Sequence, residues 1–181
     1  AMRLSRNHGI TSDSDQMIEQ PANEIWRYQQ IHLGFNYRIT DIQAALGLSQ
    51  LNKLDEFVSA RHDIADRYDQ ELTLDELSAP WQHPDAISSF HLYPVRLRSD
   101  VAKISQATLV SRLVSSEIHV NHHYIPVYRH PFYESLGFKR GYCPEAETYF
   151  QETISLPIFP GLSYIDQTHV IDSLKRAVLN P

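Results

Sequence analysis

Residues 33–51, LGFNYRITDIQAALGLSQL, restrict the possible fold of this chain more than any other segment. A polar and aromatic loop runs directly into TDIQ, a capping-box pattern in which the Thr40 hydroxyl and the Gln43 amide satisfy backbone N–H groups at a helix start. A helix N-terminus carries partial positive charge, so Asn36 and Arg38 beside it are candidates to bind an anion such as phosphate. On spacing alone, a capping box that only caps its helix is the commoner outcome.

Composition narrows the class of protein. With 181 residues, 42% of them hydrophobic and 21% charged, the chain suits one soluble globular domain with a substantial core. A net charge of −6 without blocks of like charge argues against nucleic acid and anionic membrane surfaces as partners. The lone Cys143 excludes an intramolecular disulfide, and neither a signal peptide nor an apolar run of about 20 residues is evident. We therefore expect a cytoplasmic protein.

The spacing of apolar residues predicts an α+β fold in which helices pack on a small antiparallel sheet. Apolar side chains recur every three or four residues from Thr40 to about Leu72 and predict one long helix. Residues 90–98 are rich in aromatic and β-branched side chains and predict a strand, where Pro94 favours an edge or a bulge. The other predicted elements are helices at 105–114, 146–153 and 165–179, a strand at 118–125, a loop at 126–145 and an extended segment at 155–162.

Four segments, in order along the chain, resemble those of one enzyme family. They are RNHGI at 6–10, GFNYRITDIQAALGLSQL at 34–51, HHYIPV and PFY at 122–133, and ISLPIFPGL at 154–162. Together they resemble the DegT-type sugar aminotransferases, pyridoxal-phosphate enzymes that aminate nucleotide-linked keto-sugars. Within that family the resemblance is to the transaminases of pseudaminic acid synthesis. It implies transfer of an amino group, from glutamate, to a UDP-linked 4-keto-6-deoxy sugar.

The segments belong to the C-terminal part of the family. The resemblance therefore implies the small C-terminal domain of an aminotransferase, without the large pyridoxal-phosphate domain. Residues 1–30 would be a tag remnant followed by an inter-domain connecting segment, and residues 31–181 the small domain. The alternative is a stand-alone, non-catalytic interaction domain derived from such an enzyme, with Met2 at its start codon.

The lysine content bears on activity. In the family, a lysine upstream of the first segment forms a Schiff base with the cofactor. No lysine of this chain stands in such a motif, so the resemblance implies no catalytic residue here. We expect the chain alone to bind no pyridoxal phosphate and to have no transaminase activity.

The resemblance also implies residues for cofactor binding. The loop asparagine of the family, Asn36 here, reaches across a dimer interface to the cofactor phosphate of the partner subunit. Arg38 is expected to neutralise a phosphate by bidentate contact, or else to pair with an acid such as Asp41. A homodimer or another form of self-association is expected, because removal of a large domain exposes apolar surface.

Substrate binding is expected on the aromatic side of the domain. The resemblance implies that His123 and Tyr124, the H-Y pair of the family, and Phe159 line the sugar, with packing at the core edge as the alternative. Strand alternation would send His122 and His123 to opposite faces. The histidines and Cys143 match no zinc spacing, so we expect no metal site.

One position departs from the family pattern. Relatives usually place glycine where this chain has Glu117, just after the predicted helix at 105–114. If the backbone there is left-handed, a glutamate carries a cost of about 1 kcal/mol.

Overall fold

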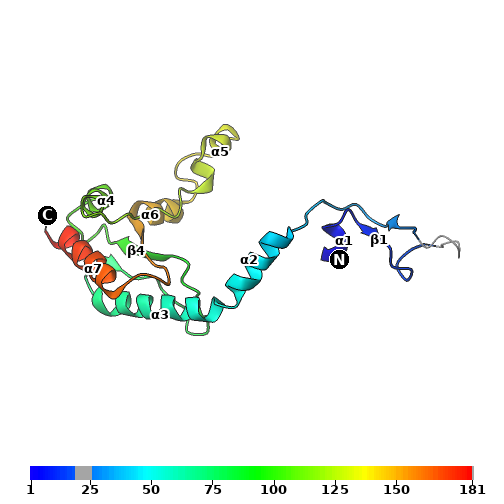
Figure 1. Cartoon of the computed structure of the whole chain (residues 1–181). Coiled ribbons are helices and arrows are strands. Elements are labelled where there is room, and N and C mark those ends of the chain that lie inside the picture. Colours follow the sequence, from blue (N-terminus) through cyan, green and yellow to red (C-terminus); the bar gives the residue numbers. More distant parts are fainter. Residues whose placement is uncertain (19–25, 181) are drawn as a thin grey trace. The chain divides into compact units, whose positions relative to one another are not determined.

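The computed structural model of the chain describes residues 1–18 and 26–180 (Figure 1). The chain divides into two compact units, Ala1–Lys53 and Leu54–Pro181. The domain boundary predicted between residues 30 and 31 falls inside the first unit and stays a prediction. The α+β fold predicted from the sequence, with helices packed on a small antiparallel sheet, is confirmed in the second unit.

In the first unit, two segments far apart in sequence lie side by side. The helix α1 (Met2–Ser5) leads into β1 (Ile10–Thr11), which pairs antiparallel with β2 (Gln29–Gln30). The pairing continues beyond the strands as an antiparallel bridge between Asn7 and Asn36. Backbone hydrogen bonds of 2.6–2.9 Å join the two segments around this bridge.

The single long helix predicted for residues 40–72 is wrong, because the structure has two helices, α2 (Asp41–Leu51) and α3 (Leu54–Glu71). After α2, the backbone N–H of Lys53 donates to the Gln50 carbonyl at 3.0 Å, three residues back instead of four. This bond closes a tight turn and ends the α-helical ladder. The residue before the lysine is an asparagine, a type that favours helix ends over helix interiors. The apolar spacing misleads because it stays in phase across the turn.

The sheet of the second unit has β4 in its centre. The strands β3 (Leu77–Ser78), β4 (Tyr93–Leu97) and β5 (Thr153–Leu156) are antiparallel in the order β3-β4-β5. The edge position predicted from Pro94 is therefore wrong. A proline is tolerated in this central strand because β3 pairs only with the last two residues of β4 and has ended before Pro94.

The strand predicted at residues 118–125 is also wrong. In the described chain this segment joins the sheet through a single bridge, between Asn121 and Ser155. The Asn121 side chain accepts the backbone N–H of His122 at 2.8 Å, which removes that donor from any strand pairing. Besides β3, the strand that pairs with β4 is β5, in the stretch predicted to end a helix and begin an extended segment.

Helices cover the sheet on both faces. On one face, α7 (Tyr164–Leu179) packs against α3 and against α4 (Gln106–Ser115). On the other face, α6 (Pro144–Glu152) lies against β4, and Arg96 of the strand pairs with Glu152 at 2.6 Å. The three predicted helices at 105–114, 146–153 and 165–179 are thus confirmed with small shifts of their ends. The predicted loop at 126–145 contains two short turns of helix, η1 (Val127–Arg129) and α5 (Pro131–Ser135).

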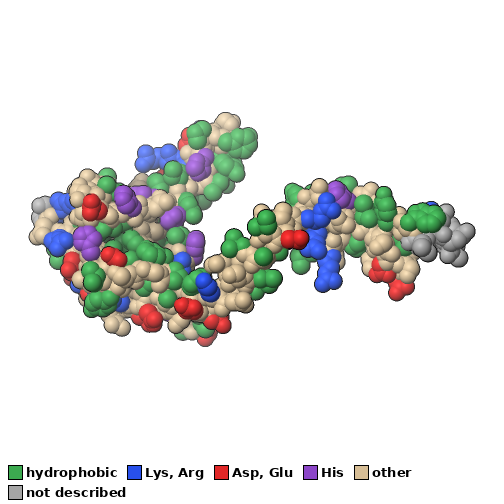
Figure 2. Space-filling view, viewed as in Figure 1, with side chains coloured by type: hydrophobic (Ala, Val, Ile, Leu, Met, Phe, Trp, Pro, Cys, Tyr) green, Lys and Arg blue, Asp and Glu red, His purple; other side chains and the backbone are tan. Residues whose placement is uncertain are grey.

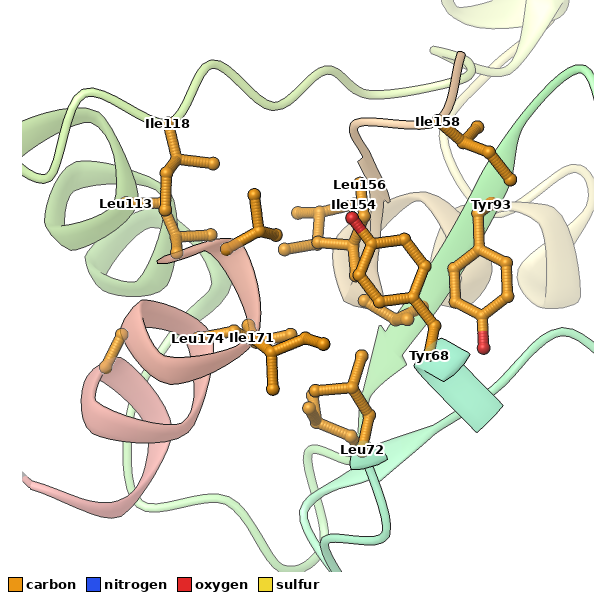
Figure 3. Packing of buried hydrophobic residues seen from close by; sticks show 14 of the residues in the cluster. Tyr68, Leu72, Tyr93, Leu113, Ile118, Ile154, Leu156, Ile158, Ile171 and Leu174 are labelled. Carbon is orange, nitrogen blue, oxygen red and sulfur yellow. The ribbon is translucent and has the colours of Figure 1, made fainter. Parts of the chain in front are cut away.

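The core lies between the sheet and the helices α3, α4 and α7 (Figure 3). The rings of Tyr68 and Tyr93 have centroids 4.9 Å apart, and the Tyr68 hydroxyl donates to the Pro157 carbonyl at 2.8 Å. Burial raises the pKa of both phenols, so they remain neutral. The largest fully buried side chains are those of Tyr68, Tyr93, Leu109, Leu113, Ile154, Ile171, Leu174, Val95 and Thr153.

Glu117 ends α4 in the left-handed conformation, with φ 61°. The N–H of Ile118 donates to the Leu113 carbonyl at 2.9 Å, and the N–H of Glu117 donates to the Val114 carbonyl at 3.0 Å. These two bonds form a Schellman motif, whose left-handed position favours glycine. Ile118 and Leu113 both belong to the buried cluster drawn in Figure 3, as the motif requires.

Replacing Glu117 by glycine is expected to raise the free energy of unfolding by about 1 kcal/mol, because the left-handed backbone costs glycine little. Urea denaturation of the chain measures this change. Ser115→Gly, two residues earlier at the last position of α4, is the control and should lower stability by several tenths of a kcal/mol, about the difference in helix propensity. An unchanged or lower stability of Glu117→Gly would contradict the assignment of strain to this position.

Candidate functional site

Two glycines allow the segments RNHGI and GFNYR to pack backbone against backbone. Gly9 has φ +70°, and a Cβ atom there would lie 1.9 Å from the carbonyl oxygen of His32. A Cβ atom at Gly34 would lie 2.3 Å from the backbone nitrogen of Gly9. A larger residue at either position requires the backbone to move. This close approach is what sets Asn7 opposite Asn36.

Arg38 joins the two asparagines. Its Nη1 donates to the Oδ1 of Asn7 at 3.1 Å, and its Nη2 donates to the Oδ1 of Asn36 at 2.8 Å. The alternative predicted for Arg38, an ion pair with Asp41, is not among the contacts of the described residues. Because each amide oxygen accepts from the guanidinium, each amide NH₂ remains available as a donor. Asn7, Asn36 and Arg38 form what we name the Asn–Arg group.

The start of α2 is capped by its own side chains. The Thr40 hydroxyl accepts the Gln43 N–H at 3.3 Å, and the Gln43 side-chain oxygen accepts the Thr40 N–H at 3.0 Å. The predicted capping box is therefore confirmed. Asp41 adds negative charge in the first turn of the helix. These contacts occupy the Gln43 N–H and place negative charge at the helix start, so the Asn–Arg group is the better candidate to bind an anion.

His123 and Tyr124 lie together, with ring centroids 4.6 Å apart in an edge-on arrangement. The Nδ1 atom of His123 lies 2.8 Å from the Ser155 hydroxyl of β5, while Tyr124 is 70% exposed. Phe159 follows β5 and is 47% exposed, and within residues 26–180 no ring contact joins it to His123 or Tyr124. His122 turns instead toward Phe150 of α6, with centroids 5.8 Å apart. The substrate roles of His123, Tyr124 and Phe159 stay predictions.

Glu147 of α6 holds the segment 126–143, which follows His123 and Tyr124, through hydrogen bonds to Tyr128 and Gly141. Its Oε1 accepts the Gly141 N–H and the Tyr128 hydroxyl, both at 2.7 Å. Arg129 and Arg140 lie 3.9 Å and 3.8 Å from the carboxylate. The Gly141 amide, followed by the Tyr128 hydroxyl, lowers the pKa of the Glu147 carboxyl. Burial, followed by the bond to Glu147, raises the pKa of Tyr128. These contacts could not be predicted from the sequence, since none of the motifs includes Glu147.

The contacts of Glu147 should weaken in acid. Because the pKa of Glu147 is lower in the folded chain than in the unfolded one, its stabilisation is present above the unfolded value and is lost as the pH falls through the folded value. We expect the amide of Gly141 to exchange faster as this occurs. In Glu147→Gln the faster exchange of the Gly141 amide in acid should disappear. Glu145→Gln changes an exposed neighbour in α6 and should keep the original pH profile of exchange. An identical profile in Glu147→Gln and the unmodified chain would contradict the account.

None of the helices in residues 1–18 and 26–180 is long and apolar enough to cross a membrane. In that same part of the chain, no group of three or more His, Cys, Asp or Glu side chains is placed to hold a metal ion.

The sequence matches a family model and several curated proteins. The model of the DegT/DnrJ/EryC1/StrS aminotransferase family covers residues 1–175. An uncharacterised protein of Methanocaldococcus jannaschii, MJ1066, is 33% identical over 179 residues, which are 98% of this chain and 46% of that protein. The UDP-4-amino-4,6-dideoxy-N-acetyl-beta-L-altrosamine transaminase of Campylobacter jejuni is 30% identical over 174 residues, 96% of this chain and 43% of that protein. The chain spans less than half the length of these relatives.

Solved structures agree with the sequence matches. The putative sugar aminotransferase Spr1654 of Streptococcus pneumoniae, in its PMP form, superposes with a TM-score of 0.81 at 27% identity, over 97% of this chain and 43% of that one. Helicobacter pylori PseC, an aminotransferase of pseudaminic acid biosynthesis, superposes with a TM-score of 0.79 at 25% identity, over 99% of this chain and 46% of that one. The fold is that of the small C-terminal domain of a pyridoxal-phosphate aminotransferase. The chain belongs to the DegT/DnrJ/EryC1/StrS aminotransferase family.

Proposed function

We propose that this chain is the C-terminal domain of a nucleotide-sugar transaminase. The complete enzyme transfers an amino group, from glutamate, to a UDP-linked 4-keto-6-deoxy sugar in the synthesis of pseudaminic acid or a related surface glycan. It works in the cytoplasm as a homodimer. The observation that carries the proposal is the Asn–Arg group, which lies in the family segments 6–10 and 34–51 and offers phosphate donors.

The Asn–Arg group fits the phosphate end of pyridoxal phosphate. It combines one guanidinium with two amides whose oxygens are already occupied, so the groups left over are N–H donors. Pyridoxal phosphate, when bound, supplies the aldehyde that carries the amino group between donor and acceptor. The task of Asn36 and Arg38 is to bind the phosphate of a cofactor that the partner subunit holds. No step of the chemistry falls to them.

The apolar surface of α2 supports a role as part of a larger enzyme. None of its residues is buried, and Ile42 and Leu46 are 84% and 62% exposed. Hydrophobic side chains are visible along the first unit in Figure 2. A helix with this much apolar surface needs a covering partner. The large domain of the complete enzyme, or a second subunit, would cover it, and the isolated chain should self-associate.

On the substrate side, we assign the sugar to His123, Tyr124 and Phe159. The pair of rings combines an imidazole held by the Ser155 hydroxyl with an exposed phenol, a combination that suits a ligand with both hydroxyl groups and apolar faces. Phe159 would complete this surface only in the assembled enzyme.

A fusion protein tests the proposed function. The N-terminal part of the Campylobacter jejuni transaminase is joined ahead of Met2, and amino transfer from glutamate to the UDP-linked 4-keto-6-deoxy sugar is followed by mass spectrometry. We expect turnover by the fusion and none by the 181-residue chain alone, whose lysines stand in no Schiff-base motif. A folded, cofactor-loaded, dimeric fusion that aminates no nucleotide-sugar would contradict the proposal. It would favour a non-catalytic interaction domain instead.

A further inference from the structure

The proposed function assigns phosphate binding to Asn36 and Arg38 only, yet Asn7 contacts the same guanidinium as Asn36. Antiparallel pairing sets Asn7 directly opposite Asn36, so the two side chains project from the same face of the pairing. Arg38 lies two residues beyond Asn36 and shares that face. The two hydrogen bonds, at 3.1 and 2.8 Å, then hold both arms of the guanidinium.

The polarity of these bonds decides what the group can bind. Arginine is only a donor, so both amides must present their oxygens to it. Their NH₂ groups are then left on the far side of each amide as donors. The result is one positive charge flanked by two neutral donors, a set that suits the three oxygens of a phosphate monoester. Basic side chains of the first unit gather around α1 in Figure 2, which adds to the positive potential there.

We propose that Asn7 is a third phosphate-binding residue of this site. It holds Arg38 through its amide oxygen and donates through its amide nitrogen to the same phosphate that Asn36 contacts. The identity of that phosphate, the cofactor phosphate of a partner subunit, rests on the proposed function. Binding of a phosphate monoester to the group itself does not.

Side-chain NMR of the full 181-residue chain tests the proposal. Inorganic phosphate is titrated at pH 7.5 against sodium chloride of equal ionic strength, and the NH₂ resonances of Asn7 and Asn36 and the Nε–H of Arg38 are followed. We expect all three to shift along one saturable curve with phosphate and not with chloride. The amides of Asn52 and Asn121 lie outside the group and should stay in place, which serves as the internal control.

Two variants separate the roles of Asn7. Asn7→Ala removes the oxygen and the donor and should raise the dissociation constant for phosphate about tenfold, the range for one bond to a charged group. Asn7→Asp keeps an oxygen for Arg38 but adds negative charge, and it should abolish binding. The backbone N–H of Ile31, which donates to the Gly9 carbonyl at 2.9 Å, reports whether the segments stay paired in each variant.

Several results would overturn the proposal. One is a phosphate-dependent shift of the Asn36 and Arg38 resonances without a shift of Asn7, and another is an unchanged dissociation constant for phosphate in an Asn7→Ala chain whose segments remain paired. The others are equal shifts with chloride and with phosphate, and no shift with phosphate at all. None of these outcomes depends on transamination. A failed fusion assay combined with a saturable phosphate response would reject the proposed function and keep the site.

Discussion

Replacing Gly9 by alanine is expected to separate the two paired segments of the first unit. The new Cβ would lie 1.9 Å from the His32 carbonyl oxygen, and that contact is with backbone, which no side-chain rotation relieves. The left-handed φ of +70° adds a cost of about 1–2 kcal/mol for any residue with a Cβ. Because Asn7 and Asn36 are opposite each other only through this pairing, the Asn–Arg group should come apart as well.

Hydrogen exchange measures the loss. The amide of His8, which donates to Phe35 at 2.8 Å, should lose protection by roughly 30-fold or more, the equivalent of about 2 kcal/mol. Gly47→Ala is the matched control, because a Cβ there meets nothing within 4 Å and alanine favours the helix by about 1 kcal/mol. Equal protection in Gly9→Ala and Gly47→Ala would show that the close approach of the segments is not needed.

Asn36→Ala should weaken cofactor binding in the fusion protein. A hydrogen bond to a charged group contributes about 1.5–3 kcal/mol, so the dissociation constant for pyridoxal phosphate should rise roughly 10- to 100-fold. In the unmodified chain the Nη2 of Arg38 donates to the Oδ1 of Asn36. The variant removes this acceptor, so the guanidinium keeps only its hydrogen bond to Asn7. Equilibrium dialysis measures the constant. Gln70→Ala replaces an exposed amide of α3 and is the control, which should leave the dissociation constant unchanged. An equal rise of the constant in Gln70→Ala would contradict a specific role of Asn36.

Local signals in the sequence predicted local structure well. The helices α4 and α7 begin after Ser105 and Ser163, whose hydroxyls accept backbone N–H groups, and their apolar faces enter the core. The capping box at Thr40 is present for the same reason, since it depends on residues four positions apart at most. Elements whose start is determined by residues close together in sequence can be predicted without knowledge of the fold.

The errors have two sources, a local turn that the apolar pattern hides and strand partners that only the folded sheet sets. An apolar pattern in phase across Lys53 concealed the turn between α2 and α3. The extended segment predicted at 155–162 overlaps β5, which pairs with β4, whereas residues 118–125 reach the sheet only through the bridge from Asn121 to Ser155. Pro94 predicts an edge or a bulge, and only the folded sheet shows that β3 ends before reaching it.

The candidate site was predicted in part. The motif predicts roles for Asn36 and Arg38 but not for Asn7, because the contact of Asn7 with Arg38 joins two segments far apart in sequence. The signal that could have found it is the glycine in each segment, Gly9 and Gly34, since two glycines in separate motifs suggest backbones in close contact. The substrate roles of His123, Tyr124 and Phe159 stay predictions, which only the assembled enzyme can test.

The central claim is that Asn36 and Arg38 serve the cofactor of the partner subunit, and subunit mixing tests it most directly. One fusion protein carries an alanine in place of the upstream Schiff-base lysine, and the other carries Asn36→Ala. Each alone should be nearly inactive at a cofactor concentration that saturates only the unmodified enzyme. Random pairing makes half the dimers mixed, each with one complete site, so the mixture should regain roughly a quarter of full activity. A mixture that stays inactive, although mass spectrometry shows mixed dimers, would contradict the claim.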